Sequence, residues 1–245
     1  MGCMMFMLET PLTIGLLVLT MIIAGAAQAG VSGAYKKYSQ VPGSRGMTGA
    51  DVARKMVHGL GVEVIEHNGG QLSDHYNPRT KTIGLSPDVY NGTSVAAIGV
   101  AAHEAGHALQ FDQGYFPIKI RNGILPIAQI GSMLAMPLVL IGFLFGAGAE
   151  AEIQLFGDAF AMPLISQIGI LLFTAILLFQ LVTLPVEFNA SRRAMQAFDS
   201  GVYLSPDEAV GAKKVLNAAA MTYVAAVAVS ALQILRLLLM SRRRR

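Results

Sequence analysis

Four long apolar runs divide this chain and limit what it can fold into. Each run is long enough to cross the hydrocarbon core of a bilayer, which takes about 20 helical residues. None contains Asp, Glu or Lys away from its ends, whereas buried helices of soluble proteins rarely stay apolar on all sides over this length. The chain is therefore predicted to be mainly α-helical and polytopic, with about four transmembrane helices. The predicted spans are residues 11–30, 124–149, 162–186 and 215–240.

The composition excludes an ordinary soluble protein and several kinds of site. Of the 245 residues, 53% are apolar and only 13% are charged. Residues 1–10 hold no Lys or Arg, so the first run is predicted to be an uncleaved anchor, although Ala27-Gln28-Ala29 resembles a signal cleavage site. Cys3 is the single cysteine, which excludes an intrachain disulfide and a thiolate metal cluster. No basic surface with interleaved aromatic residues is present, so no nucleic-acid partner is expected.

Basic residues flank the spans unevenly and predict the orientation. Under the positive-inside rule, residues 31–122 and 187–214 face the cytoplasm, and the acidic connection 147–160 lies outside. The tail Arg242–Arg245 disagrees, because four spans would place it opposite the other basic segments. Either the tail is an exception, or the last run does not fully cross. Nine flanking basic residues against four in the tail favour the cytoplasmic orientation, and the nine are Lys36, Lys37, Arg45, Lys119, Arg121, Arg192, Arg193, Lys213 and Lys214. The acidic connection holds Glu150, Glu152 and Asp158.

The stretch between the first two spans, residues 31–122, is predicted to form a small α+β lobe at the membrane surface. Thr48-x-x-Asp51 resembles a capping box followed by apolar residues at helical spacing, which predicts an amphipathic helix over residues 48–60. Residues 62–66 are mostly β-branched and favour a strand. The whole chain, 1–245, is expected to be one membrane-embedded domain.

The rest of the lobe leads into a helix. Residues 74–78 and 81–86 are expected to form a loop and a second strand or hairpin, and the strand near 81–85 is expected to offer an edge to an extended substrate. Residues 94–110 then look like one continuous helix, with Ser94 as its N-cap.

That helix contains the pentapeptide His103-Glu104-Ala-Gly-His107. Positions i and i+4 lie one above the other on a helix, so His103 and His107 can bind one metal ion. Glu104 follows the first histidine and can take a proton from a metal-activated water without binding the metal itself. The alternative is a pair of helix histidines that are hydrogen-bonded to carbonyl groups.

A catalytic zinc needs a third protein ligand, because it keeps one position open for water. Glu187 directly follows the third predicted span, and it is a carboxylate on a helix on the same predicted side of the membrane. The second and third spans form a hairpin, which brings their outer flanks together at one surface. Glu187 is therefore predicted as the third ligand. The alternative is a membrane-edge carboxylate paired with Arg192 or Arg193.

These residues give the chain a resemblance to the neutral zinc metallopeptidases of the YugP type, which are small bacterial membrane proteins distantly similar to the prenyl-peptidase and heat-shock protease clan. The resemblance spans most of the chain. It is carried by segments 48–55, 72–79, 101–110 and 184–194.

The resemblance implies His103, His107 and Glu187 as zinc ligands and Glu104 as the catalytic carboxylate. In the wider clan the glutamate ligand begins the pattern E-x-x-A-D. Here Ala190 is in place, but Ser191 stands where the Asp would be. The metal ligands are expected to be oriented by hydrogen bonds with Asn189, Ser191 and Arg192, or with a backbone carbonyl.

The resulting hypothesis is a zinc metalloendopeptidase in which Glu104 acts as general base on the metal-activated water. A second group must stabilise the oxyanion. The candidates are His75, Tyr76, Arg192 and Arg193; His75 is preferred, although it is equally compatible with a plain surface histidine. The expected partners are the lipid bilayer and a membrane-associated protein or peptide substrate. The expected compartment is the bacterial inner membrane, with the site facing the cytoplasm. The competing hypothesis is a non-proteolytic scaffold with a structural metal or none.

Overall fold

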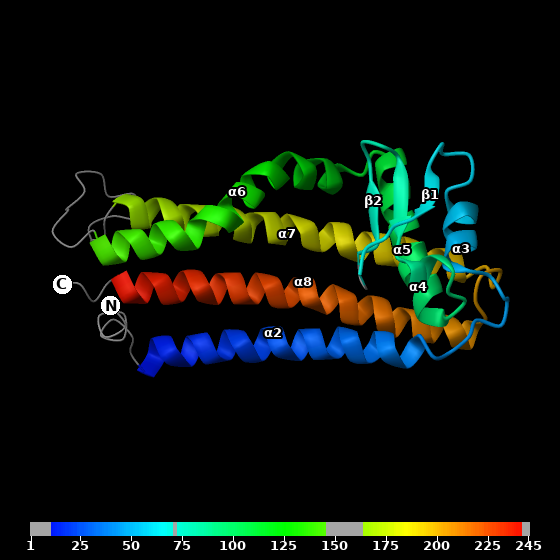
Figure 1. Cartoon of the computed structure of the whole chain (residues 1–245), viewed down its shortest axis with the longest axis horizontal. Helices are drawn as coiled ribbons and strands as arrows, with labels where there is room; N and C mark the ends of the chain where they lie inside the picture. The colour runs from blue at the N-terminus through cyan, green and yellow to red at the C-terminus, as the bar shows by residue number, and fades with distance from the viewer. Residues whose placement is uncertain (1–10, 71–72, 146–163, 242–245) are drawn as a thin grey trace. The chain divides into compact units, whose positions relative to one another are not determined.

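A computed structural model describes residues 11–70, 73–145 and 164–241 of the chain. Two features used for the orientation, the acidic connection 147–160 and the tail Arg242–Arg245, lie outside the described residues. Helices make up most of what is described, with one small sheet, so the predicted mainly α fold is confirmed (Figure 1).

Four long helices contain the predicted spans. By length and composition all four are able to cross a membrane, which agrees with the expected polytopic arrangement. Each helix extends past the apolar run that predicted it, because apolar length marks the span and not the helix ends. The four are α2 (Pro11–Tyr38), α6 (Phe116–Phe145), α7 (Leu164–Phe198) and α8 (Pro206–Ser241).

The extension of α7 matters most for the site. The segment after Pro185 is rich in Glu, Arg, Ala, Met and Gln, which favour helix, and it contains no glycine before Gly201. Gly201 has a φ of 66°, a left-handed conformation that suits glycine. Glu187 therefore lies inside a continuous helix rather than after one.

The chain divides into two compact units. Unit 1 comprises 1–26, 120–182 and 223–245, and unit 2 comprises 27–119 and 183–222. Each is described by itself.

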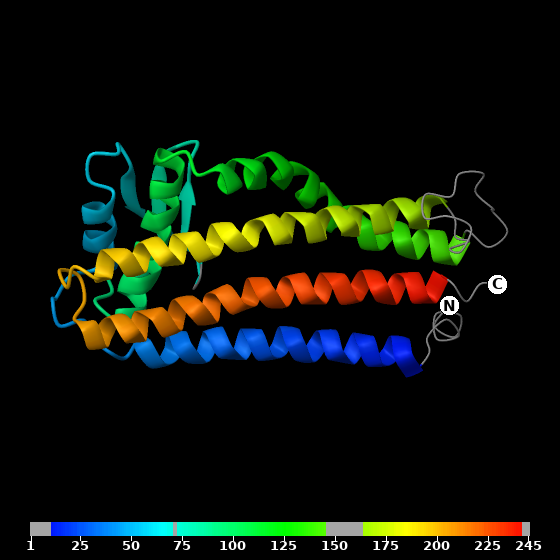
Figure 2. The ribbon, with the colours of Figure 1, turned by 180° about the vertical axis from the view of Figure 1, so that it is seen from behind.

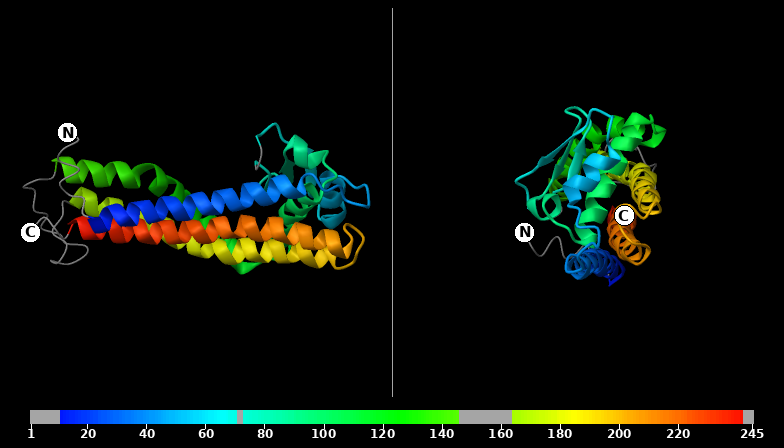
Figure 3. Two further views of the ribbon diagram at one scale, coloured as in Figure 1. Left: turned by 90° about the horizontal axis from the view of Figure 1, so that it is seen from below. Right: turned by 90° about the vertical axis from the view of Figure 1, so that its right-hand side faces the viewer.

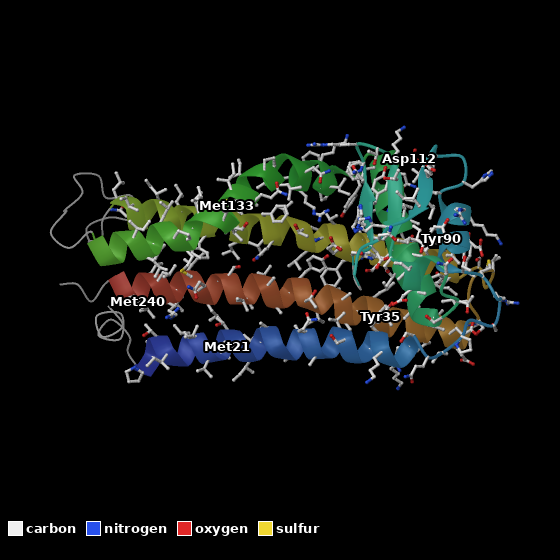
Figure 4. The ribbon with its side chains drawn as sticks, in the orientation of Figure 1. Met21, Tyr35, Tyr90, Asp112, Met133 and Met240 are labelled. Atoms are coloured by element: carbon white, nitrogen blue, oxygen red, sulfur yellow. The ribbon has the colours of Figure 1, made fainter. Side chains whose placement is uncertain are left out.

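Unit 1 consists of the apolar parts of the four long helices. Large apolar side chains are exposed on it, including Met21 at 67% and Met133 at 73%, as expected of helices that face lipid. In Figure 4 the side chains around the labelled Met21 and Met133 are mostly carbon. Small residues allow close helix contact: a β-carbon on Gly169 would lie 2.8 Å from the Ala135 carbonyl oxygen.

Unit 2 is built around α5 (Val95–Asp112). One apolar cluster joins α5 to α3 (Gly49–Met56) and to the sheet, and a second joins α5 to the polar ends of α7 and α8. The views from behind and along the molecule show these elements around α5 (Figures 2 and 3). The short helix α4 (Pro87–Tyr90) precedes it, and the Ser94 hydroxyl accepts from the Ala97 N–H, which confirms the predicted N-cap.

The sheet orders its three strands as β1 (Glu63–Glu66), β3 (Thr82–Leu85) and β2 (His75–Asn77). β1 pairs with β3 in parallel, and β2 pairs with β3 antiparallel. The strand predicted over 62–66 is confirmed. The expectation that 81–85 presents a free edge is wrong, because β3 is the central strand and both of its edges are occupied. Within the described residues the edge strands are β1 and β2.

The predicted capping box at the start of α3 is confirmed. The Thr48 hydroxyl accepts from the Asp51 N–H, and the Asp51 carboxylate accepts from the Thr48 N–H. The helix ends at Met56, four residues earlier than predicted, and Gly59 and Gly61 follow with positive φ. Both conformations end a helix readily and favour glycine.

Candidate metal centre

Helix α5 places the two motif histidines on one face. His103 and His107 are one turn apart, and their ring centroids are 4.8 Å apart with the planes nearly perpendicular. His107 is buried and His103 is mostly buried. This is the i, i+4 geometry that the sequence predicts for two ligands of one ion.

Glu187 comes to the same point from α7. Its Oε2 atom lies 3.2 Å from His103 Nε2 and 3.6 Å from His107 Nε2, and the Glu187 side chain is buried. The metal-binding atoms of the three residues all lie within 4.8 Å of one another. The structure therefore brings together the three residues that the sequence singles out, as a possible His/His/Glu metal-binding cluster.

The cluster depends on close contact between the backbones of α5 and α7. Gly106 lies inside the pentapeptide, and a β-carbon placed on it would be 2.6 Å from the Ala190 carbonyl oxygen. Only a residue without a side chain fits there. The alanines around it on α5, Ala101, Ala102, Ala105 and Ala108, are all buried.

The spacing fits a small divalent cation. Zinc binds nitrogen and carboxylate oxygen at about 2.0–2.2 Å in a tetrahedron, which puts neighbouring ligand atoms about 3.3–3.6 Å apart. The distances from Glu187 Oε2 to His103 Nε2 and to His107 Nε2, 3.2 and 3.6 Å, lie close to the two ends of that range. Three protein ligands would leave the fourth position open, as in catalytic zinc sites.

The Nδ1 atom of each histidine also contacts a polar side chain. His103 Nδ1 lies 3.1 Å from Ser191 Oγ, and His107 Nδ1 lies 3.0 Å from Gln110 Oε1. The Gln110 amide in turn donates to Asn189 Oδ1 at 3.0 Å. Hydrogen bonds of this kind fix the ring orientation and leave Nε2 facing the cluster.

Two of the three predicted orienting residues thus lie behind the ligands, Ser191 directly and Asn189 through Gln110. The third, Arg192, is exposed. Sequence reasoning missed Gln110, because an amide is not a metal ligand. Its position three residues after His107, on the same face of the helix, is the signal that could have found it.

The electrostatics favour a cation at this point. Burial alone would lower the pKa of His107, but the interaction with Glu187 and the charge of Glu104 outweigh it and raise that pKa above the ordinary imidazole value. The surroundings of His107 therefore stabilise positive charge, whether a proton or a metal ion carries it.

Glu104 is buried beside the cluster, at 8% exposure. No hydrogen bond joins its carboxylate to another described residue, and neither of its oxygens is among the fully buried unpaired atoms of the described part of the chain. The carboxylate is therefore accessible to a water or a substrate.

His75 lies elsewhere in unit 2, at the start of β2. Its side chain is exposed, its Nδ1 lies 2.9 Å from the Ser73 carbonyl oxygen, and its ring meets that of His67 edge-on at 5.1 Å. Neither neighbour belongs to the cluster, so the oxyanion role of His75 stays a prediction.

Comparisons with known proteins agree with this geometry. The family described as "Putative neutral zinc metallopeptidase" matches residues 13–242. The chain belongs to this family. A curated relative, the "Putative membrane protease YugP" of Bacillus subtilis (strain 168), is 43% identical over 212 residues, which cover 86% of this chain and 88% of that protein. No solved structure matches the chain significantly.

The name of the curated relative and the four apolar helices of this chain agree on a membrane protein. The family name specifies zinc, and the His/His/Glu cluster is a donor set that suits zinc. Both the resemblance drawn from the motifs and the membrane character of the chain are thereby confirmed.

Proposed function

We propose that this member of the neutral zinc metallopeptidase family is a zinc-dependent membrane endopeptidase, with His103, His107 and Glu187 as metal ligands and Glu104 as general base. The observation that carries the proposal is the meeting of two imidazoles from α5 and one carboxylate from α7 at zinc-like spacing. The name of the curated relative, a membrane protease, supports the same reaction class.

The chain's own residues supply most of the chemistry. When bound, zinc would act as a Lewis acid that polarises the substrate carbonyl and acidifies water. Glu104 is buried next to the cluster with its carboxylate unengaged, so it can hold a proton removed from water and return it to the leaving amine. The burial of Glu104, His107 and Glu187 strengthens these charge interactions.

An extended substrate would pair with β2 rather than with β3. β2 is an edge strand, and it lies along α5, where the Tyr76 ring packs against Phe111 at 5.4 Å. Phe111 is one turn after His107 on the same helix. A peptide added to β2 would therefore run past the histidine-bearing stretch of α5, with main-chain hydrogen bonds fixing its register.

Location favours a substrate at or in the membrane. Glu187 lies on the helix that continues from an apolar span, so the cluster would sit near the bilayer surface. Under the positive-inside rule, the basic residues around the site unit favour the cytoplasmic side of the inner membrane.

The test uses the full chain purified in detergent. Zinc content is measured, and hydrolysis of casein is compared for the wild type and Glu104→Gln, which keeps the side-chain shape but cannot accept the proton. The expected result is about one zinc per chain in both, with hydrolysis in the variant reduced by at least about 100-fold. Equal hydrolysis in the two would overturn the proposal and favour the non-proteolytic scaffold.

A further inference from the structure

Gln110 is the most completely buried polar residue near the cluster. It lies on α5 with 0% exposure, and every polar atom of its side chain is engaged. Its Oε1 lies 3.0 Å from His107 Nδ1, and its Nε2 donates to the Val186 carbonyl oxygen at 2.8 Å and to Asn189 Oδ1 at 3.0 Å. The Gln110 amide therefore contacts His107, which is one ligand of the cluster. It also contacts α7, the helix that carries the ligand Glu187.

The Val186 contact fixes which way the amide points. A backbone carbonyl can only accept, so the Gln110 nitrogen must face Val186 and the oxygen must face His107. An amide oxygen also only accepts. His107 must then carry a hydrogen on Nδ1, and in the neutral ring this leaves the lone pair on Nε2, which faces Glu187.

Arg193 fixes the orientation of the Asn189 amide in the same way. Its Nε donates to Asn189 Oδ1 at 2.8 Å, and the same guanidinium donates to Gln113 Oε1 at 2.6 Å. A guanidinium has no acceptor atom, so Asn189 must present its oxygen toward Arg193 and Gln110. Gln113 is the C-cap of α5, so Arg193 on α7 bridges back to the helix of Gln110.

We infer that Gln110 is a positioning residue that sets the tautomer of His107 and holds the backbone next to Glu187 in register with α5, with Asn189 and Arg193 fixing its orientation. The inference rests on the proposed function for the identity of the metal. Val186 immediately precedes Glu187, so a single side chain couples the ligand histidine on one helix to the ligand carboxylate on the other. Ser191 holds His103 independently, which leaves that ring as an internal reference.

The first experiment measures zinc affinity by competition with a chelator. Gln110→Leu is expected to bind zinc about 10- to 100-fold more weakly, the usual loss for a group that orients a metal ligand. Asn189→Leu is expected to weaken binding in the same direction by a smaller factor. Asn189→Asp keeps an acceptor for both Gln110 and Arg193 and is expected to stay within about threefold of the wild type. Lys214→Gln, an exposed charge change on α8, controls for net charge.

The second experiment reads the tautomer in the metal-free protein by ¹⁵N histidine NMR. At a pH at which the ring is neutral, the wild type is expected to show His107 with its hydrogen on Nδ1. In Gln110→Leu that preference is expected to be lost for His107 and kept for His103. A Gln110→Leu protein that binds zinc as the wild type does and keeps the Nδ1–H form of His107 would overturn the inference.

Gln110→Leu alters a fully buried position. If that variant does not fold, Asn189→Leu and Arg193→Gln test the same inference. Arg193 is only half-buried, and its loss is expected to weaken zinc binding in the same direction as Asn189→Leu without unfolding the chain. The outcome is separable from the proposed function. If Glu104→Gln hydrolyses casein like the wild type while Gln110→Leu still loses zinc, the peptidase proposal fails and the positioning role stands.

Discussion

The carbonyl oxygen of Ala190 lies 2.6 Å from the position that a β-carbon on Gly106 would occupy. Gly106 is between the two motif histidines on α5, and Ala190 is three residues after Glu187 on α7. This backbone contact sets the distance between the imidazoles and the carboxylate. A backbone oxygen cannot swing aside as the end of a flexible side chain can, so the contact is a condition for the metal centre.

Gly106→Ala is therefore expected to separate α7 from α5. Overpacking of this kind typically costs about 1–3 kcal/mol of stability, and the separation is expected to weaken zinc binding by at least about tenfold. Thermal unfolding in detergent and chelator competition measure the two effects.

Gly33→Ala is the matched control. Gly33 lies on α2 with nothing within 4 Å of a new β-carbon, so the change only gains helix propensity, worth up to about 1 kcal/mol. If Gly106→Ala behaves like Gly33→Ala in both measurements, the backbone contact does not determine the metal site.

Ser191 stands where the related clan has an aspartate, and its hydroxyl lies 3.1 Å from His103 Nδ1. Ser191→Ala removes the only group seen behind that ring in the described chain and is expected to weaken zinc binding about 10- to 100-fold. Ser191→Asp supplies a stronger acceptor for the Nδ1–H and is expected to match or exceed the wild type. Chelator competition on the three proteins decides; a Ser191→Ala protein with unchanged affinity would show that this hydrogen bond does not support the ligand.

Removal of the metal is expected to lower the stability of the wild type, and this effect is expected to require Glu187. An ion that binds only the folded protein stabilises it by about 2.7 kcal/mol at 100 times its dissociation constant, so chelation is expected to lower the unfolding temperature. Glu187→Gln keeps the side-chain volume but loses the anionic ligand, and its unfolding temperature is expected not to respond to zinc or chelator. A zinc response equal to that of the wild type would exclude Glu187 as a ligand.

The sequence predicted the spans and the cluster because both follow from strong local rules. Hydrocarbon requires about 20 apolar residues, and two ligands at i and i+4 share a helix face. Glu187 was found because few carboxylates follow a span. By contrast, β2 is a short polar strand that forms through its pairing with β3, a nonlocal interaction that the residues of β2 do not encode by themselves.

The orienting residues show the same limit. The spacing of Gln110 from His107 indicates a contact with that ring, but the contacts with Val186 and Asn189 on the neighbouring helix follow only from the structure. A role for Ser191 is predicted from the clan pattern, which has an aspartate at that place.

The capping box of α3 predicts a specific pH dependence. The pKa of Asp51 is lowered, chiefly because its carboxylate accepts the backbone N–H of Thr48, with the Thr48 side chain contributing next. A lowered folded-state pKa stabilises the fold above the ordinary value, which is about 4, and this contribution is lost as the pH falls through the folded value. Asp51→Asn lacks this titration.

The difference in unfolding temperature between the wild type and Asp51→Asn is therefore expected to be largest near neutral pH and to shrink below about pH 4. Using the difference between the two proteins cancels the other titrating carboxylates. Thr48→Ala provides the contrast: it removes the hydroxyl, at a cost of about 1 kcal/mol, but keeps the backbone N–H that Asp51 accepts, so its curve is expected to be displaced while the acid dependence persists. A wild-type and Asp51→Asn difference that stays constant from pH 7 to below about 4 would mean that the carboxylate charge contributes nothing to the cap.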